Sequence, residues 1–325
     1  MRTDSDFCIS VIIPVYNAEM YIEKAINSAI NQQDVSEVIV VDDGSTDKSF
    51  SICKRLESSN LKIQVWQHPD RANHGRSATR NFGISKATSP FIAFLDADDF
   101  FLPGRFETDK EKFKKYPEID GVYNAIGAKF YRKAVRGEME RLKLITVTDY
   151  VEHEDLFKTM YPIGHLGYFS GIGLTVKKSL LQVTGTFSEN LEVAEDTELW
   201  VRMSLIGKLI PGEIKKPVAM RGVHGKNVSF RDKSLYLINN EKMFENLLGW
   251  AFKNKISSKN INILWERNCR IRKNNGHSSL EITSFVSKNI QQYPSLLFSK
   301  HTYRYLPFLR EIKNILTFQN IREIK

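Results

Sequence analysis

The chain has 325 residues, a formal net charge of +9 and three cysteines. This length suits one large domain with an appendage. The spacing of Cys8, Cys53 and Cys269 fits neither a metal site nor a disulfide framework. No apolar run approaches the roughly 18 residues that cross a bilayer, and no secretory segment follows Met1. We therefore expect neither a disulfide-stapled secreted protein nor a membrane-spanning chain, but a protein of the reducing cytoplasm.

The charge is unevenly distributed along the chain. Residues 1–230 have a net charge of −1, whereas residues 231–325 have a net charge of +10. We expect a nearly neutral catalytic domain over residues 1–230 and a basic, mostly helical extension over residues 231–325.

Apolar runs of strand length alternate with helical patterns over the first hundred residues. The predicted strands cover residues 9–15, 37–41, 61–66 and 91–95. An amphipathic helix is predicted over residues 18–32, and another helix after residue 75. Pro14 lacks an amide hydrogen, so it belongs at the edge or exit of its strand. This alternation indicates a doubly wound, mostly parallel α/β sheet.

Polar clusters follow three of these strands. Tyr16 follows the first strand, Asp43 follows the second, and Asp96, Asp98 and Asp99 follow the strand that begins at residue 91. The carboxyl ends of parallel strands meet at one edge of a sheet, where open α/β sheets bind ligands. Asp96 and Asp98 are separated by one small residue. Such a pair offers hard oxygen ligands to Mg²⁺ or Mn²⁺, which also take oxygens from a diphosphate. A solvated acidic turn is the alternative.

The second half of the first domain repeats this pattern less regularly. A surface helix is predicted over residues 103–116, paired strands over residues 121–132, and a glycine-rich loop leading to a short strand over residues 163–176. A helix then begins near Glu195, Asp196 and Glu198. Acids at a helix N-terminus are stabilised by the helix dipole, so a purely structural role is open for them.

Five segments in this order resemble the motifs of family 2 glycosyltransferases, which have the GT-A fold and include enzymes of bacterial polysaccharide biosynthesis. The segments are SVIIPVYN at 10–17, VDDGSTD at 41–47, GRSATRNFG at 75–83, FLDADD at 94–99 and AEDTELW at 194–200. The resemblance covers residues 8–230. It implies a Rossmann-like, mostly parallel sheet flanked by helices, with a C-terminal helical extension added. It also implies inverting transfer of a sugar from a nucleotide-diphosphate donor.

The resemblance assigns roles to particular residues. Asp196 becomes the general base for the acceptor hydroxyl, with Glu195 as the alternative. Asp98 and His224 become ligands of Mn²⁺ or Mg²⁺; a structural role for His224 stays open. The residues expected to bind the nucleotide are Pro14, Tyr16, Glu19, Asp43, Arg76, Arg80, Asp96, Ala97 and Asp98.

The expected donor is a UDP-sugar, and the expected acceptor is a hydroxyl of a glycan or of a lipid-linked saccharide. We expect transfer of a single sugar, since the chain lacks the Gln-X-X-Arg-Trp motif and membrane helices of processive synthases. The alternatives are a sugar nucleotidyltransferase and a catalytically inactive membrane-bound scaffold. A dinucleotide site is not supported, because no Gly-X-Gly-X-X-Gly follows the first strand.

The C-terminal extension combines helical patterns with basic and aromatic residues. Helices are predicted over residues 235–252 and 261–272, and residues 297–316 interleave aromatic with basic side chains. This segment either packs as a helical appendage or lies on an anionic membrane surface. We expect no nucleic-acid partner, since no recognised module accompanies the charge. A homo-oligomer formed through the same apolar residues is compatible with the pattern. The expected location is the cytoplasm, at the inner face of the membrane.

Overall fold

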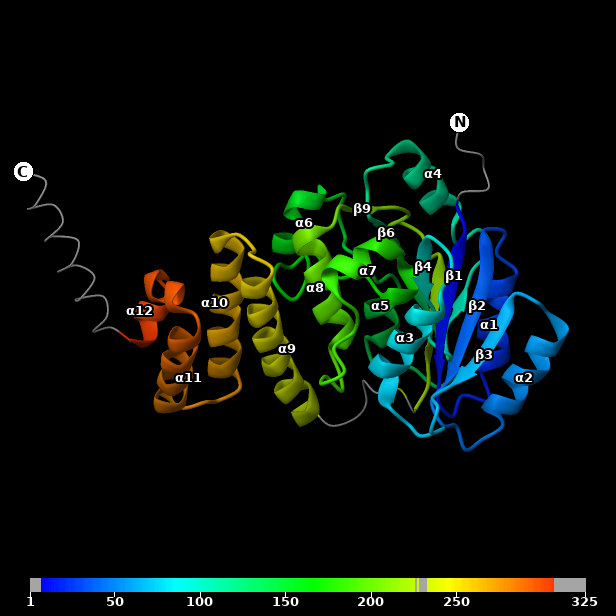
Figure 1. The fold of residues 1–325 in the computed structure, drawn as a ribbon, viewed down its shortest axis with the longest axis horizontal. Helices are drawn as coiled ribbons and strands as arrows, with labels where there is room; N and C mark the ends of the chain where they lie inside the picture. Colours follow the sequence, from blue (N-terminus) through cyan, green and yellow to red (C-terminus); the bar gives the residue numbers. More distant parts are fainter. Residues whose placement is uncertain (1–6, 226, 228–232, 307–325) are drawn as a thin grey trace, which may run out of the picture. The chain divides into compact units, whose positions relative to one another are not determined.

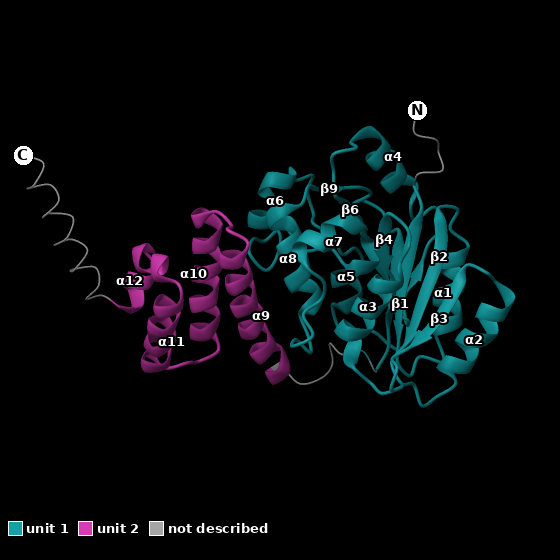
Figure 2. Ribbon diagram, in the orientation of Figure 1, with its two compact units in different colours: residues 1–232 teal, residues 233–325 magenta. Residues whose placement is uncertain are grey.

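The computed structural model describes residues 7–225, 227 and 233–306. Two compact units make up the chain, residues 1–232 and residues 233–325 (Figure 2). Among the described residues, no helix is both long enough and apolar enough to span a membrane.

A seven-stranded sheet forms the centre of the first unit (Figure 1). Its strands are β1 (Ile9–Val15), β2 (Val35–Asp42), β3 (Ile63–Gln67), β4 (Phe91–Phe94), β6 (Gly121–Tyr123), β8 (Leu174–Lys177) and β9 (Leu209–Pro211). They lie in the order β3-β2-β1-β4-β8-β6-β9. Strand β8 is antiparallel to both of its neighbours, and the other neighbouring pairs are parallel. The mostly parallel sheet expected from the sequence is therefore confirmed.

A second, three-stranded sheet has the order β5-β10-β7. Its strands are β5 (Phe100–Phe101), β7 (Ile126–Phe130) and β10 (Ala219–Val223). The helices of this unit are α1 (Ile22–Ile30), α2 (Ser49–Ser59), α3 (Gly75–Lys86), α4 (Glu107–Lys115), α5 (Glu138–Arg141), α6 (His153–Thr159), η2 (Gly171–Gly173), α7 (Lys178–Thr184) and α8 (Glu195–Ile206). The predicted pairing within residues 121–132 is wrong, because β6 joins the large sheet and β7 joins the small one.

Strand β1 lies at the middle of the large sheet and separates two parts of the core. Val11 and Ile13 face the cluster that contains the buried side of α1, whereas Ile12 packs with Ile84 of α3. Gly83 allows this close approach, since a Cβ there would lie 2.6 Å from Ile12 Cγ2. Helix α3 is thereby held against the strands whose ends carry the polar clusters.

Pro14 occupies a position that its chemistry permits. Its strand is central, but the pairing of β1 with β4 ends at Ile12, so that Pro14 pairs only with Val41 of β2. The prediction that Pro14 lies where its strand leaves the sheet is correct. Its missing amide hydrogen breaks no hydrogen bond with β4, because β4 is not paired at this position.

The second unit is helical. It contains α9 (Lys233–Lys253), α10 (Ser258–Asn274), α11 (Ser279–Gln292), η4 (Pro294–Phe298) and α12 (Thr302–Tyr305). Trp265 of α10 is fully buried, and its ring stacks on Phe285 of α11 with 5.6 Å between centroids. The Asn268 amide donates to the carbonyl of Phe244 at 2.7 Å, which joins α10 to α9. A capping box of Ser278 and Glu281 begins α11.

Glu37 closes the end of the sheet opposite to the polar clusters. Its Oε1 accepts hydrogen bonds from the Ser10 hydroxyl at 2.5 Å and from the Thr88 amide at 2.6 Å, and its Oε2 accepts one from Gln64 at 2.9 Å. Burial raises the pKa of Glu37, but the hydrogen bonds from Ser10, Thr88 and Ser89 outweigh this effect and hold the pKa below its ordinary value. The ionised carboxylate therefore stabilises the fold above the pKa of the unfolded chain, and this stability is lost as the pH falls through the folded pKa.

We predict that Glu37→Gln lowers the free energy of unfolding at pH 7 by about 1.5–3 kcal/mol, as expected for loss of a hydrogen-bonded charge. The difference from wild type should shrink below about pH 4, where carboxylates protonate. Urea unfolding at pH 7, 5 and 3.5 measures it. Glu118→Gln, at an exposed site, is the control and should cost little at any pH. A pH-independent cost in the Glu37 variant would contradict the prediction.

Candidate active site

The polar clusters meet because the strands that precede them are parallel. Strands β1, β2 and β4 run in the same direction, so the segments that follow Val15, Asp42 and Phe94 emerge at one edge of the sheet. A hydrogen bond of 2.8 Å from the Asp43 amide to the Val15 carbonyl joins the first two segments. The edge predicted from the sequence is the one at which these residues gather.

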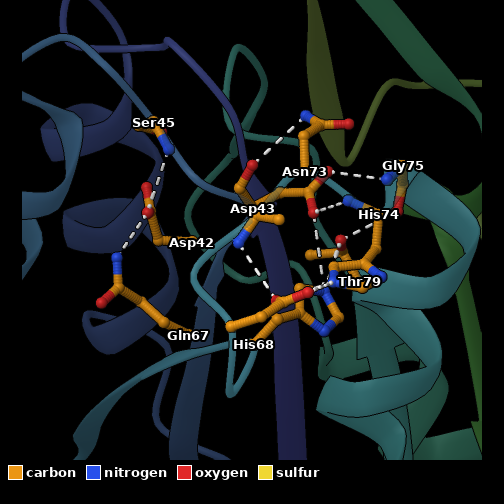
Figure 3. A network of polar contacts seen from close by, with 11 residues as sticks. Asp42, Asp43, Ser45, Gln67, His68, Asn73, His74, Gly75 and Thr79 are labelled. Atoms are coloured by element: carbon orange, nitrogen blue, oxygen red, sulfur yellow. Dashed lines mark hydrogen bonds and ion pairs between the residues drawn. The ribbon is translucent and has the colours of Figure 1, made fainter.

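Asp43 fixes the beginning of helix α3 (Figure 3). It is buried, and its two carboxylate oxygens accept hydrogen bonds from the amides of His74 at 2.8 Å and Gly75 at 3.0 Å. The Asn73 side chain donates to the Asp43 carbonyl at 3.2 Å, and His68 Nε2 lies 3.5 Å from Oδ1. A carboxylate at a helix N-terminus accepts hydrogen bonds from amides that have no partner within the helix, and the positive end of the helix dipole stabilises its charge. This predicted nucleotide residue thus also has a structural role.

The neighbouring Asp42 carries the network toward the loop after β2 (Figure 3). Its Oδ2 accepts hydrogen bonds from the Ser45 amide at 3.2 Å and from Gln67 of β3 at 3.0 Å. Both acids of the pair are therefore held in place before any ligand arrives.

The loop after β1 is tied to the same segment. Asn17 has a φ of 50°, and its side-chain oxygen accepts from the Thr46 amide at 2.8 Å. Glu19 accepts from the Lys48 amide at 3.0 Å, and its own amide donates to Asp47 at 3.1 Å. Glu19, predicted to bind the nucleotide, thus holds two loops together. Tyr16 is 52% exposed, which leaves its ring open to a planar ligand.

Arg80 joins the acidic turn after β4 to the start of helix α8. One guanidinium nitrogen lies 2.7 Å from Asp96 Oδ1, and the other lies 2.9 Å from Glu195 Oε1. Arg76, one turn earlier on α3, lies 3.6 Å from Glu195 through its Nε. Arg80 and Glu195 are buried. Burial raises the pKa of Glu195, as does the neighbouring Asp196, while the two arginines oppose that shift.

Asp196 differs sharply from Glu195. It is exposed, and its Oδ1 accepts a hydrogen bond of 2.6 Å from the Thr197 amide. It lines a small cavity of about 70 Å³ together with Tyr168, Ser170 and Arg221. Of the two neighbouring acids, Asp196 is therefore the one that a bound molecule can reach.

Asp98 and His224 are brought together from distant segments. Asp98 Oδ2 lies 2.9 Å from His224 Nε2 and accepts a hydrogen bond of 3.0 Å from Asn227. The ring of Tyr21 stacks on His224 with 4.8 Å between centroids. The described residues contain no group of three metal-binding side chains. One carboxylate and one imidazole nevertheless suit a divalent ion that takes its remaining ligands from a diphosphate and water.

Asp99, the third acid of the turn, points away from this pair. Its Oδ1 accepts a hydrogen bond of 2.8 Å from the Gly222 amide in the small sheet, and the side chain is buried. Burial and the nearby charges of Asp98 and Asp96 raise the pKa of Asp99 well above its ordinary value. Asp99 therefore anchors the turn to β10. Ala97, between the two outer acids, is buried.

Several residues of the site were not singled out by sequence reasoning. Asn227 contacts Asp98, and Tyr168 and Arg221 line the cavity beside Asp196. The charge of Arg221 is attracted to the acidic turn, since it favours the ionised forms of Asp96 and Asp99. Arg221 and Asn227 lie three residues before and after His224, so the segment around that histidine could have pointed to them. Nothing in the sequence pointed to Tyr168 except its position in a glycine-rich segment.

Comparison with known proteins gives the same fold and a family match. Residues 10–170 match the model of Glycosyl transferase family 2. The chain is 30% identical over 214 residues to the succinoglycan biosynthesis protein ExoU of Rhizobium meliloti, which covers 61% of this chain and 56% of that protein. It spans 39% to 49% of the length of three other curated relatives, each an uncharacterized glycosyltransferase.

Two solved structures are similar to the chain. S. aureus TarS 1-349 in complex with UDP-GlcNAc has a TM-score of 0.61 at 20% identity, over 86% of this chain and 79% of that one. The mannosyltransferase PcManGT of Pyrobaculum calidifontis, in complex with GDP-Man and Mn²⁺, has a TM-score of 0.52 at 17% identity, over 97% and 89%. At these identities the likeness establishes the fold alone, and the GT-A fold expected from the sequence is confirmed.

We predict that Arg80→Ala lowers the free energy of unfolding by about 3–5 kcal/mol, because the buried Glu195 loses its nearer partner and keeps only the Nε of Arg76 at 3.6 Å. Arg55→Ala is the matched control. It removes an exposed pair with Glu23, 2.9 Å apart, which is worth about 0–1 kcal/mol. Urea unfolding of both variants measures the difference. Equal losses in the two variants would rule out a structural role for the Arg80 bridge.

Proposed function

Through residues 10–170 the chain belongs to glycosyl transferase family 2, and on that premise we propose that it is an inverting glycosyltransferase that moves one sugar from a nucleotide-diphosphate donor to a hydroxyl. The observation that carries the proposal is the division of labour between two neighbouring acids. Glu195 is buried against Arg80, whereas Asp196 is exposed at a cavity that Arg221 also lines.

Asp196 is the proposed general base. It takes the proton of the acceptor hydroxyl as the oxygen forms a bond to the anomeric carbon of the donor sugar. The bond from that carbon to the diphosphate breaks on the opposite face, and the nucleoside diphosphate leaves with the electron pair. Attack opposite the leaving group inverts the anomeric configuration. The cavity beside Asp196 is proposed to receive part of the sugar or acceptor.

The donor is proposed to lie along the edge of the sheet. Pro14, Tyr16 and Asp43 surround the base and ribose, while Arg76 and Arg80 stay near the diphosphate as fixed cations. Asp98 and His224 would hold Mn²⁺ or Mg²⁺, which supplies charge neutralisation for the departing diphosphate when bound. Asp96, held by Arg80 at 2.7 Å, faces the nucleotide.

The proposed donor is a UDP-sugar, supported by the similar fold of TarS in complex with UDP-GlcNAc. A divalent metal is supported by the mannosyltransferase of the same fold, in complex with GDP-Man and Mn²⁺. The likeness to a succinoglycan biosynthesis protein supports a glycan or a lipid-linked saccharide as acceptor. Peripheral contact with an anionic membrane at its cytoplasmic face and self-association are further proposals for the basic unit.

Part of the segment proposed for that membrane contact can be placed. Within residues 297–316, Phe298 is 73% exposed and Leu306 is buried. Residues 307–316 lie outside the described part of the chain.

Incubation with a panel of nucleotide sugars, with and without Mn²⁺, tests the proposed function directly. Sugar transfer or slow release of UDP from one donor supports a glycosyltransferase. Formation or cleavage of a nucleotide sugar with pyrophosphate would instead indicate a nucleotidyltransferase. No turnover and no nucleotide binding would support an inactive scaffold.

We predict that Asp98→Ala lowers the Mn²⁺-dependent affinity for UDP by at least about tenfold, which corresponds to about 1.4 kcal/mol, because the ion loses its carboxylate ligand. Isothermal titration with UDP, with and without Mn²⁺, measures this change. Asp149→Ala removes an exposed aspartate elsewhere and should bind as wild type does. Unchanged affinity in the Asp98 variant would remove this residue from the metal site.

We predict that Asp196→Asn keeps the affinity for UDP and slows transfer by about 10²–10⁴-fold, the usual contribution of a general base. The amide keeps the shape of the side chain but takes up no proton. Initial rates and titration with UDP measure the two effects separately. Glu195→Gln is the matched neighbour, and we expect it to lower thermal stability through its contact with Arg80. Wild-type rates in Asp196→Asn, with transfer abolished in Glu195→Gln, would reverse the assignment.

A further inference from the structure

The helical unit contains a pocket that has no part in the proposed transfer. Its volume is about 330 Å³. One wall is a single face of α10, whose lining residues are spaced three or four positions apart. The other wall is α12 and the residue before it. The lining residues are Glu266, Cys269, Arg270, Lys273, Asn274, His301, Arg304 and Tyr305.

The two walls are held together by buried hydrogen bonds. Trp265 Nε1 donates to Thr302 Oγ1 at 3.0 Å, and this hydroxyl donates in turn to the carbonyl of Leu296 at 2.6 Å. Trp265 and Thr302 are fully buried. Because breaking either bond would leave a buried polar group without its partner, the α12 turn is fixed against α10. The pocket therefore exists without a ligand.

The charge around the pocket is predominantly positive. Arg270 pairs with Glu266 one turn earlier on α10. Lys273 and Arg304 make no ion pair within the described part of the chain and are exposed. Burial raises the pKa of Cys269 to about 12, so its thiol adds no charge. Lys273 and Arg304 therefore face the pocket without an ion-pair partner among the described residues, and such an arrangement repels metal ions and attracts anions.

His301 completes the donor set at the other wall. Its Nε2 lies 3.9 Å from Glu266. Burial lowers the pKa of His301, and so do the positive charges of Lys300, Arg270 and Arg304, whereas Glu266 raises it. A neutral imidazole still offers one N–H to an anion. An arginine fork, an ammonium group and a ring N–H together match the several oxygens of a phosphate group better than a single carboxylate.

We propose that the pocket between α10 and α12 binds the phosphate group of a ligand, with Lys273 and Arg304 as its charged contacts and His301 as a further hydrogen-bond donor. The phosphate belongs either to a lipid headgroup or to a soluble phosphate ester. This site lies entirely within residues 266–305 and is independent of sugar transfer, so it can fail or hold without bearing on the proposed function.

The test uses the full chain and two kinds of probe. Inorganic phosphate and glycerol phosphate are titrated at constant ionic strength, and the imidazole NMR signals of His301 are followed, with His301→Gln for assignment. In parallel, the chain is sedimented with vesicles of phosphatidylcholine alone and with vesicles containing phosphatidylglycerol. Lys273→Glu and Arg304→Glu are compared with Lys259→Glu, which makes the same charge change at an exposed position of α10. Thermal unfolding confirms that each variant folds.

We predict that each pocket variant weakens binding by at least tenfold, whereas the Lys259 variant changes it less than threefold. Shifts with soluble phosphates but no vesicle binding identify a soluble ester. Binding to phosphatidylglycerol vesicles that the pocket variants lose identifies a lipid headgroup. Equal losses in all three variants would mean attraction by net charge alone and would overturn the proposal. Absence of binding to every probe would overturn it as well.

Discussion

The guanidinium of Arg80 is the contact on which the arrangement of the candidate site depends. It joins Asp96, at the end of a central strand, to Glu195, at the start of a helix about a hundred residues later. A planar fork can hold two carboxylates at fixed angles, which a lysine cannot do. Because Arg80 is buried, either acid would lose much of its compensation if the fork were removed. The acidic turn after β4 and the start of helix α8 are thereby held in one fixed relation.

This bridge also gives two neighbouring acids different surroundings. Glu195 is buried and engaged by Arg80, so a bound molecule cannot readily reach its carboxylate. Asp196 follows one position later on the helix, so it points about 100° away and remains exposed. The sequence alone left both acids open as the general base, since capping and catalysis favour the same residue types at a helix N-terminus.

The sequence predicted the elements of the first hundred residues well, because each strand there is a continuous apolar run and each polar cluster follows a strand end. The prediction failed where the sequence pattern shows which side chains share one face of a strand but not which other strand it pairs with. The alternation over residues 121–132 predicted strands correctly, yet β6 and β7 belong to different sheets. Asp43 and Glu19, which the sequence assigned to the nucleotide, also hold backbone amides, and the sequence did not predict this second role. Hydrogen bonds between distant loops leave no mark in local sequence.

The balance of charge at the edge gives an independent physical reason to expect a cation there. Asp96, Asp98, Asp99, Glu195 and Asp196 carry the carboxyl groups of this edge, and burial raises the pKa of both Asp99 and Glu195. Arg76, Arg80 and Arg221 are the nearby cations. Even if Asp99 and Glu195 were both neutral, the three remaining carboxylates would match the three guanidinium groups, which leaves no surplus positive charge to offset that of a diphosphate. A divalent ion beside Asp98, as proposed, would supply that charge. The net charge of the whole chain therefore says little about this site, and the local balance of charge supports the proposal that donor binding depends on a metal.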